Sequence, residues 1–203
     1  MIVKDAFLFL LPLFAAAITS FVLGWGAAGF FLLLVAGFVA FFFRNPRREI
    51  PRDPRLIVSP ADGRVVEVER AGGATKLSIF LSIFNVHVNR SPIAGRIEAV
   101  DYKAGKFRAA FRHAASIENE RNIVMVSHGG INLVFTQIAG LVARRIVFWK
   151  KVGDTVDKGE LVGLIRFGSR VDVLFPAGTE VTVEKGARVR GGSTPIGVIK
   201  GHS

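Results

Sequence analysis

The stretch IVMVSHGGINLVFTQI, residues 123–138, decides the fold class of this chain. It holds two runs of apolar and β-branched residues on either side of a glycine pair. Short runs of this composition between turn residues are typical of β-strands. Further runs of this kind are Arg64–Glu69, Lys76–Ile83, Gly95–Val100, Arg144–Phe148, Leu161–Ile165, Val171–Leu174 and Glu180–Glu184. The pattern predicts a mainly β fold, either an antiparallel sandwich or a barrel.

The start of the chain has a different composition. From residue 6 to residue 43 no side chain is charged, and only Gly24-Trp25-Gly26 interrupts the apolar run. One membrane-spanning helix needs about 20 apolar residues, and a signal peptide has a much shorter apolar stretch. Residues 7–23 and 27–43 therefore predict a hydrophobic helical hairpin, residues 1–43, that spans the membrane or inserts partway. A buried helix pair of a soluble protein is the alternative.

A basic segment follows the apolar residues directly. Its arginines are Arg44, Arg47, Arg48, Arg52 and Arg55. Because Pro46, Pro51 and Pro54 disfavour a helix, residues 44–56 are predicted to form a stiff linker. The positive-inside tendency places this flank, and the domain after it, on the cytoplasmic side of the cell (inner) membrane. Basic residues are also attracted to an anionic membrane surface. No nucleic-acid-binding motif is present, so nucleic acid is not an expected partner.

Residues 57–203 form the predicted β domain. Residues 44–203 carry 26 basic and 15 acidic residues, so the whole net charge of +11 belongs to them. The chain has no cysteine, which excludes disulfides, a thiol nucleophile and thiolate metal ligands. The histidines His87, His113, His128 and His202 are scattered, so no metal site is expected.

Gly191-Gly192-Ser193-Thr194 is the segment with the most unusual chemical potential. Such residues ordinarily form a turn. However, glycines lack the Cβ atoms that block a strained backbone, so the Gly192 carbonyl can be presented to the Ser193 hydroxyl. Attack would convert the amide into an ester, and elimination of the ester would leave a pyruvoyl group at residue 193. The segment therefore predicts either a plain turn or a self-made electrophilic cofactor.

Two other positions supply what such a reaction needs. A serine hydroxyl is a weak nucleophile and requires a base. His87, in the run Phe84–Pro92, is the candidate base, and Asp62, in Ser59-Pro60-Ala61-Asp62-Gly63, is the candidate partner that orients the imidazole. Taken singly, Asp62 is more simply a turn residue and His87 a packing residue.

Five motifs stand out along the chain: Ser59–Gly63, Val86-His87, Glu118–Asn122, Phe167-Gly168-Ser169 and Gly191–Thr194. They occur in the order seen in phosphatidylserine decarboxylases, and the chain resembles the short, A-type branch of that family. The resemblance covers nearly all of residues 44–203.

The resemblance implies a specific activity and cofactor. The chain would cut itself between Gly192 and Ser193 into a large chain, 1–192, and a small chain, 193–203. Ser193 would become the pyruvoyl group, assisted by Asp62 and His87. That group would form a Schiff base with phosphatidylserine in the membrane and release phosphatidylethanolamine and carbon dioxide. Neither a metal ion nor pyridoxal phosphate would be required.

Two departures from the family pattern are present. Gly191 stands where many members have leucine, which leaves the scissile Gly192-Ser193 pair intact. Phe84 stands where longer members have a second histidine, so the group that returns the proton in turnover is left open. Arg121 and Arg170 lie in family motifs and are candidates for the substrate phosphate, although the sequence does not select either.

Val152–Leu161 resembles half of a lipoyl or biotinyl-type barrel-sandwich domain. Lys158 lacks the flanking methionine of those carriers, so the resemblance concerns the fold alone. It leaves a second hypothesis, a membrane-anchored, non-enzymatic barrel-sandwich adaptor, although residues 70–150 lack the heptad run of such adaptors. A third is the same reaction on archaetidylserine. The sequence is compatible with a homo-oligomer.

Overall fold

The computed structural model describes residues 1–105, 119–140, 145–166 and 169–200. The chain divides into two compact units, Met1–Arg47 and Arg48–Ser203. The second half of the predicted linker, from Arg48 onward, therefore belongs to the second unit.

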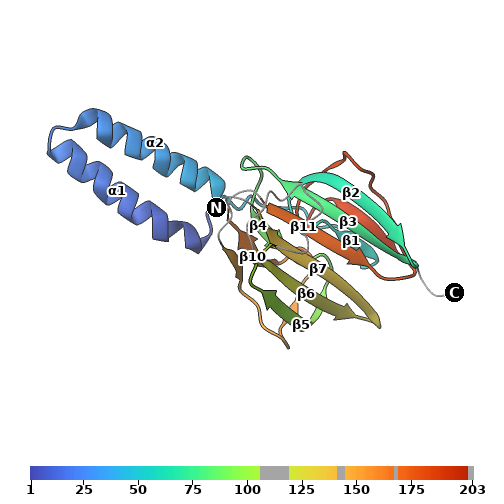
Figure 1. The fold of residues 1–203 in the computed structure, drawn as a ribbon. Coiled ribbons are helices and arrows are strands. Elements are labelled where there is room, and N and C mark those ends of the chain that lie inside the picture. Colours follow the sequence, from blue (N-terminus) through green and yellow to red (C-terminus); the bar gives the residue numbers. More distant parts are fainter. Residues whose placement is uncertain (106–118, 141–144, 167–168, 201–203) are drawn as a thin grey trace. The chain divides into compact units, whose positions relative to one another are not determined.

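The first unit is a helical hairpin. It consists of a short 3-10 helix η1 (Lys4–Ala6), α1 (Phe7–Val22) and α2 (Gly26–Phe42) (Figure 1). The predicted helices lie within one residue of these bounds. A turn at Gly24, with φ of +78°, joins the helices. Val3 N–H donates to the Phe43 carbonyl over 3.1 Å, which fixes the open end.

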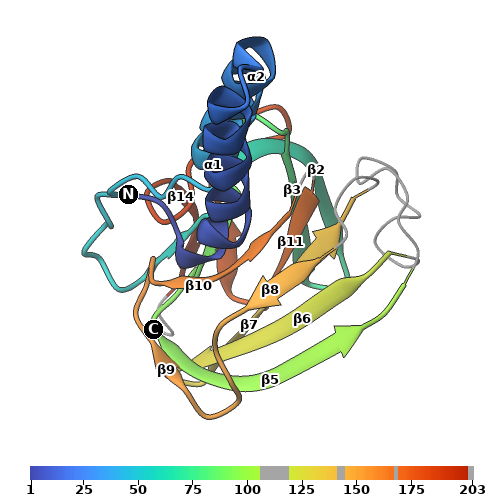
Figure 2. The same cartoon turned by 90° about the vertical axis from the view of Figure 1, so that its left-hand side faces the viewer.

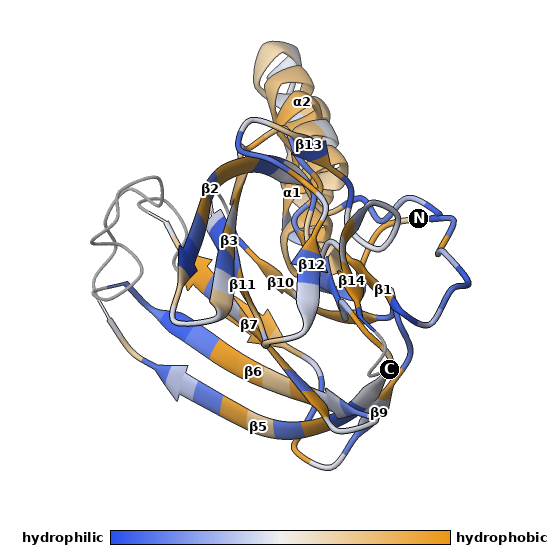
Figure 3. Cartoon of the chain, turned by 90° about the vertical axis from the view of Figure 1, so that its right-hand side faces the viewer, coloured by the Kyte–Doolittle hydropathy of each residue, from blue (hydrophilic) through white to orange (hydrophobic). Residues whose placement is uncertain are grey.

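The two helices pack closely and are apolar along their length (Figure 3). A Cβ atom added to Gly29 of α2 would lie 2.8 Å from the ring of Phe21 in α1. The segment Lys4–Val22 is long and apolar enough to cross a membrane, whereas Gly26–Phe42 is shorter. Insertion of this hairpin into a bilayer stays a prediction.

The second unit is built from antiparallel strands, which confirms the mainly β prediction (Figure 2). The strands are β1 (Leu56–Val58), β2 (Gly63–Ala71), β3 (Ala74–Leu81), β4 (Val88–Arg90), β5 (Gly95–Lys103), β6 (Arg121–His128), β7 (Ile131–Ala139), β8 (Ile146–Phe148), β9 (Thr155–Val156), β10 (Leu161–Ile165), β11 (Ser169–Phe175), β12 (Thr179–Val181), β13 (Arg188–Val189) and β14 (Pro195–Ile199). Each predicted run coincides with a strand, although β12 is shorter than predicted and Arg144 lies outside the described residues. The strands that the sequence analysis did not identify are β1, β4, β9, β13 and β14.

The long strands form one curled sheet together with the two-residue strands β13 and β9, in the order β13-β2-β3-β11-β7-β6-β5-β9. Bulges interrupt β2 between Val65 and Glu67 and β5 between Ile97 and Ala99. A bulge bends its strand and increases the local twist, which helps a wide sheet to curl. Two three-stranded sheets, β4-β10-β8 and β1-β14-β12, complete the unit. The main core is a cluster of buried aliphatic side chains together with Phe135 and Phe175.

Strand β14 follows the Gly192-Ser193 bond almost directly and is the central strand of its sheet (Figure 3). Gly197 is opposite Ile57 of β1 on one side and Val181 of β12 on the other. Ile196 is fully buried and belongs to the main core. The last described residues are therefore an integral part of the β unit.

Candidate functional site

The segment Arg190–Thr194 forms a tight turn between β13 and β14. The N–H groups of Ser193 and Thr194 both donate to the Arg190 carbonyl, over 3.1 and 3.0 Å. In return, the Arg190 N–H donates to the Thr194 hydroxyl over 2.9 Å. The turn is thus closed on Arg190, with Gly192 and Ser193 at its tip.

Gly192 is the most constrained residue of this turn. Its φ of +78° lies in the left-handed region, which residues with a Cβ rarely adopt. A Cβ added here would lie 2.8 Å from Cδ of Arg90 and 3.1 Å from Cδ1 of Ile50. Its N–H donates to the Ser59 carbonyl over 2.8 Å. Both the backbone conformation and the surrounding side chains therefore require glycine at this position.

Asp62 holds the other glycine of the turn. Its Oδ1 accepts a hydrogen bond of 2.8 Å from the Gly191 N–H. Nη2 of Arg48 donates to both carboxylate oxygens, at 2.8 and 2.7 Å. The side chains of Arg48 and Asp62 are only 10% and 14% exposed. The carboxylate thus connects the turn to a mostly buried guanidinium group.

The backbone around Asp62 is also tied to the turn. The Ser59 N–H donates to the Thr194 carbonyl over 2.9 Å. Inside the loop, the Ser59 hydroxyl donates to the Ala61 carbonyl over 2.6 Å. The predicted loop at Asp62 and the predicted cleavage segment are therefore one hydrogen-bonded unit, although about 130 residues separate them in the sequence.

His87 lies just before β4 and is 1% exposed. Its Nδ1 lies 3.0 Å from the Asn85 carbonyl oxygen. Because a carbonyl can only accept, this contact requires the proton on Nδ1, which makes Nε2 the basic nitrogen of the neutral ring. The His87 carbonyl accepts from the Ile165 N–H, and Ile165 packs with Ala61 beside Asp62. His87 is thus anchored to the part of the core that borders the Asp62 loop.

Arg90, which is not among the predicted site residues, lies against Gly192. Its N–H donates to the Pro60 carbonyl over 2.9 Å, and its Nη1 donates to the Gly159 carbonyl over 2.7 Å. Burial lowers the pKa of this guanidinium group, as does the nearby charge of Arg48, whereas Asp62 acts in the opposite direction. The one sequence signal for Arg90 is its position in the run Phe84–Pro92, which also contains His87.

The sequence predicts that Arg48 belongs to a basic flank that is attracted to anionic lipid. In the structure its guanidinium group binds Asp62 and is largely buried. A linear sequence shows the charge of this residue but not the carboxylate that a distant loop brings to it.

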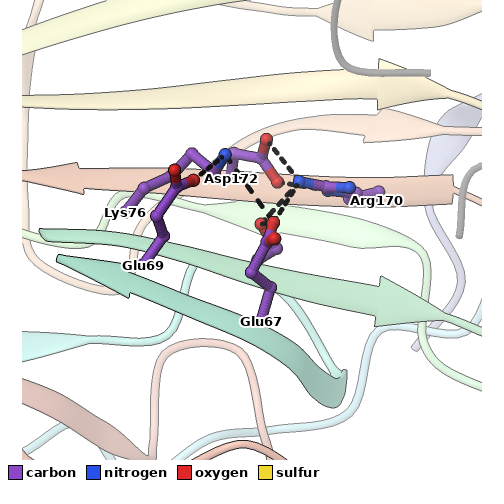
Figure 4. Close-up of polar contacts among 6 residues, drawn as sticks. Glu67, Glu69, Lys76, Arg170 and Asp172 are labelled. Atoms are coloured by element: carbon purple, nitrogen blue, oxygen red, sulfur yellow. Dashed lines mark hydrogen bonds and ion pairs between the residues drawn. The ribbon is translucent and has the colours of Figure 1, made fainter. Parts of the chain in front are cut away.

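Arg170, one of the two candidate phosphate-binding residues, belongs instead to a buried ion network (Figure 4). It is 2% exposed, and its Nε lies 2.5 Å from Oδ1 of Asp172. Its Nη2 donates to Glu67 over 3.2 Å and to the Ser78 hydroxyl over 2.7 Å. The guanidinium group is therefore bound by Glu67, Asp172 and Ser78 in the buried part of the sheet, and it is not exposed for contact with a lipid phosphate. Arg121, the other candidate, begins β6.

Within the described ranges, no group of three or more His, Cys, Asp or Glu residues is arranged to hold a metal ion. Several predicted motif residues and histidines lie outside these ranges, namely His113, Glu118, Phe167, Gly168 and His202.

Residues 35–197 match the family model of phosphatidylserine decarboxylase. The chain belongs to the phosphatidylserine decarboxylase family. It is 52% identical over 198 residues to the phosphatidylserine decarboxylase proenzyme of Solibacter usitatus, and the match covers 96% of this chain and 95% of that protein. A proenzyme of the same name from Carboxydothermus hydrogenoformans is 50% identical over 181 residues, covering 85% of each chain.

A third relative, the phosphatidylserine decarboxylase proenzyme of Symbiobacterium thermophilum, is 47% identical over 204 residues, which is 97% of this chain and 94% of that protein. Membership of this family confirms the resemblance and makes the chain a decarboxylase. The alternative of a non-enzymatic adaptor is therefore wrong.

Proposed function

We propose that this chain is made as a proenzyme, cuts itself between Gly192 and Ser193, and then decarboxylates phosphatidylserine to phosphatidylethanolamine and carbon dioxide. The observation that carries the proposal is the geometry of Gly192. This residue has a positive φ, leaves no room for a Cβ, and directly precedes the serine. Family membership supports the substrate, and the word proenzyme in the relatives' names supports processing.

The proposed self-cleavage consists of an attack, an elimination and a hydrolysis. Oγ of Ser193 attacks the Gly192 carbonyl carbon, and the C–N bond breaks, so that an ester replaces the amide and the nitrogen of residue 193 becomes an amine. Loss of the α-proton of residue 193 then expels the Gly192 carboxylate from its Cβ. The enamine that results tautomerises, and water replaces its nitrogen, which leaves as ammonia. The products are a chain 1–192 with a free carboxylate and a chain 193–203 with a ketone at its start.

The surrounding residues have distinct roles in these steps. His87, whose Nδ1–H donates to the Asn85 carbonyl, takes the Ser193 proton at Nε2. Asp62 holds the turn through the Gly191 N–H, so the Gly192 carbonyl is positioned before the attack. The guanidinium group of Arg90 is packed against Gly192 and is partly desolvated. A fixed cation beside a developing oxyanion stabilises it more strongly than water does.

The environment of residue 193 also fits the pyruvoyl group that cleavage would form. Ser193 is half-buried, and the side chain of Arg90 lies against the residue before it, Gly192. Once formed, the group supplies an electrophilic ketone that binds the substrate amine and accepts the electron pair released with carbon dioxide. Because Asp62 already compensates the charge of Arg48, the positive charge that favours a substrate with a free carboxylate is that of Arg90.

The location of the protein follows from the substrate. A diacyl lipid stays in the bilayer, so the β unit works at the headgroup level, and the apolar segment Lys4–Val22 is suited to anchoring it there. We place the β unit on the cytoplasmic side of the cell membrane because of the arginines that follow α2. The large and small chains stay together because β14 is paired on both sides.

Intact-mass analysis of the purified protein tests the processing step. We expect two chains, 1–192 and 193–203, from the wild type, and a single precursor from Ser193→Ala. His87→Ala is expected to leave mostly precursor, whereas the exposed His128→Ala serves as the matched control and should be cut normally. An active preparation that contains only the full-length chain would disprove the proposal. Release of labelled carbon dioxide from carboxyl-labelled phosphatidylserine then tests the substrate.

A further inference from the structure

A surface pocket of about 520 Å³ lies beside the cleavage turn. Three arginines line it, Arg64 of β2, Arg188 of β13 and Arg190 of the turn itself. Ser82 and Asn85, from the loop after β3, line it as well. The pocket borders the turn that carries Ser193, because Arg190, whose carbonyl closes that turn, is one of its lining residues.

The arginines of this pocket are placed against one another. Arg64 and Arg188 are directly opposite in the antiparallel pair of β2 and β13. Side chains in this relation point to the same face of the sheet, and like charges there are destabilising. Nε of Arg64 donates to the Gly186 carbonyl over 3.1 Å, which holds one guanidinium group in place and maintains the repulsion.

No carboxylate in the described part of the chain neutralises this cluster. The one acidic residue of the pocket, Asp62, already binds Arg48 and the Gly191 N–H. Among the residues that the structure describes, Arg188 and Arg190 make no ion pair with an acidic side chain. The pocket therefore carries a net positive charge that an anionic ligand would offset.

We propose that this pocket binds the phosphodiester of the lipid headgroup and so positions the headgroup amine at residue 193. This inference rests on the proposed function and adds the residues that select the substrate. Guanidinium groups bind phosphate oxygens through paired, charge-assisted hydrogen bonds. Only two carbon atoms separate the phosphate ester oxygen of a phosphoserine headgroup from its amine. A phosphate beside Arg190 therefore leaves the amine close to the turn.

The rim of the pocket favours a lipid over free phosphate. Ser82 and Asn85 enclose a short turn, in which the Asn85 N–H donates to the Ser82 carbonyl and Oδ1 of Asn85 accepts from the Ser82 N–H. The two residues at its tip, Ile83 and Phe84, are 41% and 66% exposed. Exposed apolar side chains beside a basic pocket suit a bilayer interface, where the headgroup and the acyl region meet.

Kinetics on vesicles test the pocket in the whole enzyme. The variant is Arg64→Gln with Arg188→Gln, and the charge-matched control is Arg70→Gln with Arg96→Gln, two exposed arginines elsewhere in the β unit. With phosphatidylserine vesicles, we expect the pocket variant to raise KM about 100-fold, from two charged contacts of about tenfold each. The control should change KM less than threefold.

A stability measurement excludes a merely structural role. Because removal of Arg64 and Arg188 relieves their repulsion, the ligand-free pocket variant should unfold at the same temperature as the wild type or at a higher one. An unchanged KM, or a KM that rises equally in the control, overturns the proposal. A lowered unfolding temperature that accounts for the lost activity does so too.

Calorimetric binding to the uncut Ser193→Ala precursor separates this proposal from the proposed function. Glycerophosphoserine should bind the precursor, and the Arg64 and Arg188 substitutions should weaken that binding at least tenfold. Inorganic phosphate should bind more weakly than glycerophosphoserine. Equal binding of the two ligands, or no effect of the substitutions, overturns the headgroup site. A wild type that neither cuts itself nor releases carbon dioxide overturns the proposed function, whatever this titration shows.

Discussion

The replacement of Gly192 by alanine is the sharpest test of the cleavage turn. The structure gives two reasons for damage, a φ of +78° and an overlap of the new Cβ with Arg90 at 2.8 Å. A left-handed backbone costs a residue with a Cβ about 1–2 kcal/mol. Moving Arg90 breaks its 2.7 Å hydrogen bond to Gly159, which costs about 1 kcal/mol.

These penalties affect the rate of cleavage as well as the stability. If the alanine relaxes the turn, the Gly192 carbonyl reaches the attack geometry only when the strain is restored, so the penalty of about 2–3 kcal/mol adds to the activation barrier. At about 1.4 kcal/mol for each factor of ten, cleavage should slow by about 30- to 150-fold. The assay follows the loss of freshly synthesised precursor by intact mass over time.

Gly178 provides the matched control within the same chain. Its φ is +80°, almost equal to that of Gly192, but no atom lies within 4 Å of the position of an added Cβ. Gly178→Ala should therefore lower stability by about 1 kcal/mol and leave the cleavage rate unchanged. If a folded Gly192→Ala precursor cleaves within threefold of the wild-type rate, the reasoning about this turn is refuted.

Three other substitutions give distinct outcomes. Asp62→Asn leaves the mostly buried Arg48 without its counter-ion, so the free energy of unfolding, measured with denaturant, should fall by about 3 kcal/mol. The small chain should also appear more slowly. Normal processing would show that the carboxylate does not hold the turn. Arg170→Met should cost about 3–5 kcal/mol by the same unfolding measurement, because Glu67 and Asp172 lose their shared cation, and a neutral result would contradict the network in Figure 4. The hydrogen bond to Glu69 raises the pKa of Lys76, so this pair's contribution is present below the ordinary lysine pKa and is lost as pH rises through the folded value. Lys76→Met should therefore flatten the fall in unfolding free energy above about pH 10, and an unchanged slope there would count against it.

The sequence was sufficient for the long strands and for the helical hairpin, because each has a local pattern. The alternation in Ile131–Ile138 and the uncharged run up to Phe43 are signals that neighbouring residues carry alone. The short strands were missed for the opposite reason. Strand β13 has only two residues, Arg188 and Val189, and β14 begins with a proline, so both depend on partners far away in the sequence.

The site shows the same division between local and distant signals. The sequence alone suggests self-cleavage at Gly192-Ser193 because the two residues that would react are adjacent in the chain. The contacts of Arg48 and Arg90 were not, since each depends on a loop brought close by the sheets. Composition gives the sign of a charge, whereas its burial and its counter-ion come only from the fold.

The position of β14 has a consequence for what happens to the protein after cleavage. Its strand pairs with β1 and β12, and Ile196 is buried in the core. If the chain is cut before Ser193 as proposed, this strand loses its covalent link to its sheet, so a denatured enzyme would have to recapture the small chain from solution. Refolding would change from a unimolecular event to a bimolecular one, and it would slow on dilution. The uncut chain could refold after a transient opening, whereas the cut enzyme would persist only for as long as it does not unfold.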